Sequence, residues 1–166
     1  MILIALGSNI SGPWGDPKQT VARALQSMNS DGIKLVQASR LLHTAPFGKP
    51  NQPTFVNAVA RIETHLPPLA LLQKLHAIER AGGRRRAVRW GPRTLDLDII
   101  DYHGLVRPQS GRLQSGLVLP HPGISERIFV LKPIAEITPK WRHPANHKTA
   151  HEMLRILKGF AQGREI

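Results

Sequence analysis

The segment from residue 95 to residue 100, Leu-Asp-Leu-Asp-Ile-Ile, limits the fold strongly because apolar and acidic residues alternate along it. Successive side chains of a β-strand point to opposite faces, so the pattern predicts a half-buried strand. Asp96 and Asp98 would share one face, while the apolar residues face a core. Two neighbouring carboxylates repel each other, so the pair indicates a bound cation. Mg²⁺ suits it, because Mg²⁺ takes one or two carboxylates together with substrate phosphates.

Arginines crowd the chain just before this strand, at positions 84, 85, 86, 89 and 93. The planar guanidinium fork of arginine matches phosphate groups. Together with the acidic pair, these arginines favour phosphoryl chemistry on a nucleotide. Two other interpretations remain open at this point. The acidic pair could be a solvated strand face without a ligand, and the arginines could bind the backbone of RNA or DNA.

Periodicity and turn signals predict the element order β-α-β-β-α-β, followed by further helices. The expected strands cover 2–6, 33–42, 54–64 and 95–100, with a short strand around 117–119. The expected helices cover 17–28, 67–79 with Gly82 and Gly83 ending it, 125–131 and 150–158. Pro133 should end the third helix and Gly159 the fourth. This order is the ferredoxin-like arrangement, an α+β fold with a mainly antiparallel sheet and helices packed on one face. We expect a single domain over residues 1–166.

Composition narrows the class of partner. The net charge of +12 predicts an anionic partner, which could be a nucleic acid, a membrane surface or a phosphorylated small molecule. The chain has no cysteine, which excludes disulfides and thiolate metal sites. No apolar run approaches the 18 or more residues of a membrane helix, and the apolar start lacks a basic segment before it. A cytoplasmic location is therefore expected.

Several other motifs give weaker signals. No glycine-rich phosphate loop is present, so a bound nucleotide must be held by side chains and metal. His143, His147 and His151 recur every four residues, yet Pro144 interrupts them, and we favour a solvated loop over a zinc site. The segment 120–122, Pro-His-Pro, is expected to be a rigid exposed turn.

Phe55 and Asn57 share one face of the strand predicted over 54–64, next to an irregular loop over 44–54. Phe55 and Phe129 have an ordinary explanation as core residues. However, an aromatic ring beside an amide also suits a flat heterocycle, because the ring stacks on it and the amide reads its edge.

These residues together carry a resemblance to the family of 6-hydroxymethyl-7,8-dihydropterin pyrophosphokinases of folate biosynthesis. The segments that carry it are Ala-Leu-Gly-Ser-Asn at 5–9, Thr-Ala-Pro-Phe-Gly at 44–48, Gln-Pro-x-Phe-x-Asn at 52–57, Glu79 with Gly-Arg-x-Arg at 83–86, Arg-Trp-Gly-Pro-Arg-Thr-Leu-Asp-Leu-Asp-Ile at 89–99, Leu-Pro-His-Pro at 119–122 and Arg-x-Phe-Val-Leu-x-Pro at 127–133. The match covers roughly residues 2 to 138.

The resemblance implies Mg²⁺-dependent transfer of pyrophosphate from ATP to the pterin hydroxymethyl group, with release of AMP. It implies two Mg²⁺ ions on Asp96 and Asp98, with Arg84 and Arg93 as further catalytic residues on the phosphates. The implied ATP-binding residues are Arg84, Arg86, Trp90, Arg93, Ile99, His121 and Arg127. The implied pterin-binding residues are Thr44, Pro46, Phe47, Phe55, Asn57 and Phe129. The expected partners are these two small molecules, without nucleic acid or membrane, and the expected state is a monomer.

Three features depart from the family pattern. Phe55 stands where a tyrosine is often found, and the basic loop is one residue shorter between Arg86 and Arg89 than in some members. An arginine often placed just before the Leu-Pro-His-Pro segment is replaced by Gly116, with Arg112 as the nearest substitute. Two rival functions remain: a nucleic-acid-binding module on the same fold, and a phosphotransferase that acts on another heterocycle.

Overall fold

The structure is a computed structural model that describes residues 1–30, 32–46, 51–85, 92–107 and 116–162, with side chains described up to residue 159. Its elements in chain order are β1 (Ile2–Ser8), α1 (Pro17–Ser27), β2 (Ile33–Ala38), β3 (Leu42–Thr44), β4 (Phe55–Thr64), α2 (Pro68–Ala81), β5 (Asp96–Tyr102), the 3₁₀ helix η1 (Ile124–Glu126), α3 (Ile128–Ile137) and α4 (Ala150–Gln162). None of the described helices is long and apolar enough to cross a membrane.

The sheet is antiparallel at every strand pair and runs in the order β2-β4-β1-β5, with β3 also paired to β4. The predicted α+β fold with a mainly antiparallel sheet is thus confirmed. The register places Gly7 of β1 opposite Asn57 of β4 on one side and opposite Asp96 of β5 on the other. Ala5 lies opposite Asp98. Asn57 and Asp96 therefore lie on the two strands that flank β1, with Gly7 between them.

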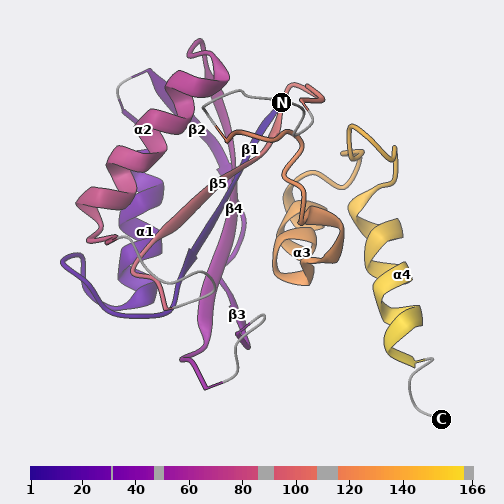
Figure 1. Ribbon diagram of the computed structural model, residues 1–166, viewed down its shortest axis with the longest axis horizontal. Helices are drawn as coiled ribbons and strands as arrows, with labels where there is room; N and C mark the ends of the chain where they lie inside the picture. Colours follow the sequence, from indigo (N-terminus) through magenta and orange to yellow (C-terminus); the bar gives the residue numbers. More distant parts are fainter. Residues whose placement is uncertain (31, 47–50, 86–91, 108–115, 163–166) are drawn as a thin grey trace.

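Helices cover both faces of the sheet, so the expectation of helices on one face is wrong. Figure 1 shows α1 and α2 on one side, and α3 on the other with α4 outside it. The reason lies in β1, which is apolar at every position from residue 2 to residue 6 and is buried on both sides. Ile4 belongs to the core under α1 and α2, whereas Leu3 packs with Val59 and Ile100 under α3. A strand without polar alternation needs cover on both faces.

The predicted starts of α1 and α4 are confirmed, whereas the third helix starts at Ile128 and not at the predicted Ser125, which lies in η1. Asp16 caps α1 in a reciprocal capping box with Gln19, and Pro17 occupies the first position of the helix. Before α4, the Thr149 hydroxyl accepts a hydrogen bond from the Glu152 backbone N–H, and the Glu152 carboxylate accepts one from the Thr149 N–H.

The predicted ends of the last two helices are wrong. Helix α3 begins after η1 and continues through Pro133 to Ile137, since Val130, Leu131 and Ile134 all bury side chains against the sheet. That burial outweighs the backbone hydrogen bond that a proline removes. Helix α4 likewise runs past Gly159.

Two strand predictions also need correction. The strand expected over 33–42 is two strands, because a register shift between Leu35 and Gln37 precedes the end of β2 at Ala38. The strand expected around 117–119 is only an isolated bridge between Arg107 and Leu119.

Candidate active site

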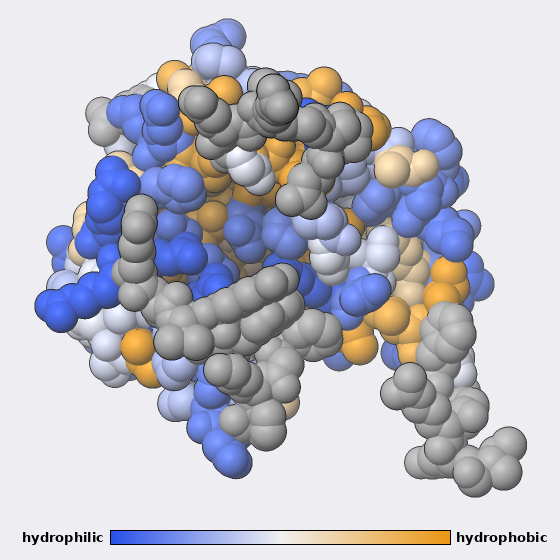
Figure 2. All heavy atoms as spheres, in the orientation of Figure 1, coloured by the Kyte–Doolittle hydropathy of each residue, from blue (hydrophilic) through white to orange (hydrophobic). Residues whose placement is uncertain are grey.

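One pocket between the sheet and the start of α3 brings most of the predicted site residues together. Its space amounts to about 760 Å³ when the open solvent at its mouth is counted. In Figure 2, hydrophilic side chains gather in the middle of this face, between the part formed by α1 and α2 and the part formed by α3 and α4. The pocket walls include Thr44, Phe55, Asn57, Arg93, Asp96, Asp98, Arg127 and Phe129. The aromatic and amide groups thus share one space with the charged groups.

The amide of Asn57 is held in a defined position inside this pocket. The Asn57 side chain is 5% exposed, and its Nδ2 donates a hydrogen bond to the Thr44 hydroxyl at 2.7 Å. Beneath it, Gly7 provides the floor: a Cβ at this position would lie 3.0 Å from Asn57 Oδ1 and 3.9 Å from the Phe55 ring. The small residue leaves room for a flat ligand on the sheet, with the amide already oriented toward it.

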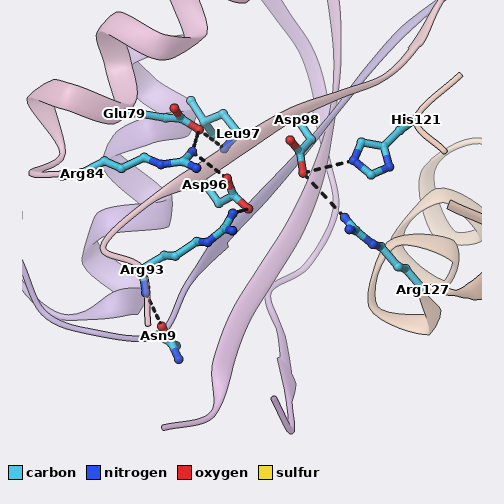
Figure 3. A network of polar contacts seen from close by, with 9 residues as sticks. All are labelled: Asn9, Glu79, Arg84, Arg93, Asp96, Leu97, Asp98, His121 and Arg127. Atoms are coloured by element: carbon cyan, nitrogen blue, oxygen red, sulfur yellow. Dashed lines mark hydrogen bonds and ion pairs between the residues drawn. The ribbon is translucent and has the colours of Figure 1, made fainter. Parts of the chain in front are cut away.

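Asp96 is paired with an arginine on each of its carboxylate oxygens. Arg84 Nη1 donates to Oδ1 at 2.7 Å, and Arg93 Nη1 donates to Oδ2 at 2.5 Å. Figure 3 shows the two arginines reaching Asp96 from the segments before β5. Both guanidinium groups therefore lie at the acidic pair, where they can meet an anionic ligand.

Asp98 has looser partners, both 3.7 Å from its Oδ2: His121 Nε2 and Arg127 Nη1. Burial and the charge of Asp96 raise the pKa of Asp98 to about 6, although the arginines around it act in the opposite direction. Burial and the charge of Arg127 lower the pKa of His121 to about 4, so the imidazole is neutral at pH 7. The partners of Asp98 are thus more distant than the two arginines that hold Asp96.

Glu79, in the last turn of α2, contacts both the backbone of β5 and the side chain of Arg84. It is 4% exposed, accepts the backbone N–H of Leu97 at 2.8 Å, and forms an ion pair with Arg84. Burial raises the pKa of Glu79 to about 7. Arg84 is therefore shared between two carboxylates, Glu79 and Asp96 (Figure 3).

Asn9 links two segments that border the pocket. Its side-chain oxygen accepts the Arg93 backbone N–H at 2.8 Å, and its Nδ2 donates to Gln52 Oε1 and to the Pro53 carbonyl at 3.3 and 3.2 Å. Because Asn9 is only 2% exposed and its amide is hydrogen-bonded to both segments, its role is to hold these segments together.

The remaining predicted residues lie in different places. His121 is beside Asp98, with its side chain only 18% exposed, so the expectation of an exposed Pro-His-Pro turn is wrong. Ile99 belongs to the core under α1 and α2, which leaves only its backbone for a ligand. Pro46 is half-buried next to the pocket residue Ala45. Phe47, Arg86, Trp90 and Arg112 fall outside the described residues.

The histidines near the C-terminus form no metal site in the described part of the chain. His147 and His151 are exposed. His143, however, is buried, and its Nδ1 accepts the N–H groups of Ala145 and Asn146, each at 3.2 Å. The solvated-loop interpretation is therefore wrong for His143, whose ring closes a turn.

Sequence reasoning gave no role to Gly7, Asn9 or Glu79, although all three lie in the segments of the resemblance. One signal could have identified Glu79. It lies four residues after Leu75, which itself follows Leu71 by four, so a charged residue continues the buried stripe of α2. A carboxylate on an apolar stripe requires a buried partner, and that partner is Arg84.

Comparison with known proteins adds independent findings. The family model described as 7,8-dihydro-6-hydroxymethylpterin-pyrophosphokinase matches residues 3–139. A Pseudomonas aeruginosa protein named 2-amino-4-hydroxy-6-hydroxymethyldihydropteridine pyrophosphokinase is 41% identical over 144 residues, which are 86% of this chain and 83% of that protein.

Longer proteins also match. The folic acid synthesis protein fol1 of Schizosaccharomyces pombe is 36% identical over 152 residues, which cover 91% of this chain but only 20% of the relative. A crystal structure of Plasmodium falciparum HPPK-DHPS superposes with a TM-score of 0.70 at 12% identity, covering 98% of this chain and 44% of that one. The chain thus spans less than half of these two proteins, and the structural likeness concerns the fold alone.

Proposed function

The chain belongs to the 7,8-dihydro-6-hydroxymethylpterin pyrophosphokinase family. We propose that it transfers pyrophosphate from ATP to hydroxymethyldihydropterin in folate synthesis, and that the pocket between the sheet and α3 is its active site. The observation that carries this proposal is that aromatic and amide side chains line the same pocket as an acidic pair. Phe55, Asn57 and Phe129 line it together with Asp96 and Asp98.

The pterin is proposed to lie on the apolar side of the pocket. Phe55 from β4 and Phe129 from α3 offer aromatic surface for its flat ring, since stacked or edge-on ring contacts contribute about 0.5–1.5 kcal/mol beyond buried area. Asn57 would read the polar edge of the ring, helped by Thr44 and by the neighbouring Pro46 and Phe47. Gly7 leaves the floor open beneath the ring.

Asp96 and Asp98 are proposed to hold two Mg²⁺ ions. Their side chains share one face of β5 and line the pocket, and they offer only oxygen ligands, which Mg²⁺ prefers. The described residues contain no cluster of three acidic or histidine ligands, so phosphate and water oxygens would complete the coordination. When bound, such ions would neutralise charge on the phosphate oxygens.

The protein's own residues position and neutralise the reactants. Transfer requires the pterin hydroxyl oxygen to form a bond to the β-phosphorus while the bond between that phosphorus and the α-phosphate oxygen breaks, releasing AMP. Arg84 and Arg93 already lie at Asp96, and Arg127 lies near Asp98, so guanidinium groups would flank phosphates bound at this pair. Positioning and charge stabilisation account for most of the catalysis of such transfers.

The rest of the nucleotide is proposed to contact Arg86, Trp90, His121 and the backbone of Ile99. His121 is neutral at pH 7 and can therefore donate a hydrogen bond without adding charge.

The test is AMP formation from ATP and Mg²⁺, with and without hydroxymethyldihydropterin. Asp96→Asn and Asp98→Asn should each lower kcat more than tenfold, a loss of more than about 1.4 kcal/mol of transition-state stabilisation, while far-UV spectra stay unchanged. Asp16→Asn is the matched control, because asparagine also caps a helix and Asp16 lies in the loop before α1. Either pocket variant with more than a tenth of wild-type kcat would exclude the metal-ligand role of that residue.

We further propose that residues 1–166 form one pyrophosphokinase domain, which acts as a cytoplasmic monomer without a nucleic-acid or membrane partner. Both helical layers pack on the same sheet, which supports a single domain. Light scattering at micromolar concentration should give the mass of one chain, and a dimer mass would contradict the proposal.

A further inference from the structure

The ion pairs along β5 form two neighbouring clusters in the described part of the chain, one around Asp96 and one around Asp98, and together they are called the network here. Glu79 contacts Arg84, Arg84 and Arg93 contact Asp96, and Arg127 contacts Asp98 (Figure 3). The carboxylates are Glu79, Asp96 and Asp98, and the guanidiniums are Arg84, Arg93 and Arg127. His121, which also faces Asp98, is neutral at pH 7. Above pH 8, where all three carboxylates are ionised, three negative charges face three positive charges, and the network has no net charge.

Only two of the three carboxylates line the pocket. Asp96 and Asp98 do, whereas Glu79 is behind the strand, 4% exposed, with its carboxylate on the Leu97 backbone and on Arg84. Glu79 is thus not placed to contact a ligand in the pocket. It adds one negative charge to the network and shares Arg84 with Asp96.

The electrostatic attraction between this network and a ligand depends on the net charge of each. ATP without metal carries about four negative charges near pH 8, whereas ATP with two Mg²⁺ ions is close to neutral. A neutral network gives the bare polyanion no net electrostatic attraction, whereas a network with an uncompensated positive charge would attract it.

We propose that Glu79 is a positioning residue that balances the charge of Arg84 and thereby makes the site select metal-loaded ATP over metal-free ATP. This inference rests on the proposed role of Asp96 and Asp98 as metal ligands. Without Glu79, Arg84 would be an unbalanced cation that metal-free nucleotide could neutralise. Bare nucleotide would then occupy the site in an unreactive form.

The experiment measures binding of the α,β-methylene analogue of ATP, which cannot transfer pyrophosphate, with Mg²⁺ and with EDTA. Burial raises the pKa of Glu79 to about 7, so titrations at pH 8.5 keep this carboxylate charged. The key quantity is the ratio of the Kd without metal to the Kd with metal. For Glu79→Gln, whose amide oxygen can still accept the Leu97 N–H, the ratio should fall about tenfold or more.

Two further variants separate charge from structure. Glu63→Gln removes the same charge from an exposed pair between Glu63 of β4 and Lys34 of β2 and should leave the ratio unchanged. The double variant Glu79→Gln with Arg84→Gln restores the balance and should return the ratio toward wild type, which loss of a purely structural contact would not do. If Glu79→Gln does not fold, Arg84→Gln alone should shift the ratio in the opposite direction.

The outcomes are distinguishable. A wild-type protein with equal affinity in Mg²⁺ and EDTA would overturn the proposed metal role and this inference with it. A wild-type preference for metal that persists unchanged in Glu79→Gln would overturn only the inference. An equal shift of the Kd ratio in the Glu63→Gln control would show a general effect of net charge and overturn the inference. A double variant whose ratio does not return toward wild type would overturn it too.

Discussion

Replacement of Gly7 by alanine should weaken pterin binding without unfolding the protein. Gly7 has no left-handed backbone conformation, so alanine can adopt its φ and ψ. The new methyl group would lie 3.0 Å from Asn57 Oδ1, closer than nearly all real contacts of this kind. Asn57 is 5% exposed and its Nδ2 bonds to Thr44 at 2.7 Å. The amide must therefore shift by a few tenths of an ångström and strain that bond.

The magnitude follows from the burial of this amide. A buried polar group that loses a good partner costs about 1–3 kcal/mol, which corresponds to a loss of pterin affinity of about 5-fold to 150-fold. Calorimetric titration with hydroxymethyldihydropterin in the presence of the α,β-methylene analogue of ATP measures this loss. Affinity for the ATP analogue alone should change by less than about threefold, because the methyl group faces Asn57 and Phe55.

Gly159→Ala in α4 is the matched control, because a Cβ there meets no atom within 4 Å. It should leave both affinities unchanged and, as a helical glycine replaced by alanine, stabilise the protein slightly. Unchanged pterin affinity in folded Gly7→Ala would refute the reasoning about the pocket floor. An equal loss of affinity for both ligands would show instead that β1 itself is displaced.

Three further predictions concern other walls of the pocket. Arg93→Lys should not restore the kcat lost in Arg93→Ala, because a point charge cannot replace the guanidinium that reaches Asp96 at 2.5 Å; full recovery in steady-state kinetics would contradict this. Phe55→Leu should lower pterin affinity by about 3-fold to 10-fold and spare ATP, as separate titrations can establish. Mg²⁺-dependent binding of the ATP analogue should weaken as pH falls through about 6, since the raised pKa of Asp98 means that this ligand protonates there. The free energy of unfolding of the ligand-free protein should instead rise as pH falls from about 6 toward 4, because protonation removes a desolvated charge from the folded state. Parallel losses of binding and stability would refute this assignment.

The parts of the fold that could be predicted from sequence are those with a local physical cause. Helix α1 begins where Asp16 and Pro17 supply a cap and a fixed φ, and β5 follows its alternation of apolar and acidic residues. Helix ends were less predictable, since Pro133 is a local stop signal that tertiary burial of α3 overrides.

The candidate site likewise has features with a local sequence cause and features that depend on tertiary packing. Asp96 and Asp98 could be predicted as a pair from their spacing on one strand. Their meeting with Phe55 and Asn57 could not be derived from spacing, because it depends on β1 lying between β4 and β5 in the sheet. The role of Glu79 likewise depends on how α2 packs beside β5, which no local pattern states.

The position of Glu79 also bears on self-association. Strand β5 is at the edge of the sheet, where an unpaired backbone N–H can recruit a strand from another molecule. At Leu97 that donor already bonds to the buried Glu79 carboxylate, so this point of the edge offers no free site for intermolecular pairing. At this point of β5, the strand that carries Asp96 and Asp98, a side chain therefore blocks edge-to-edge pairing.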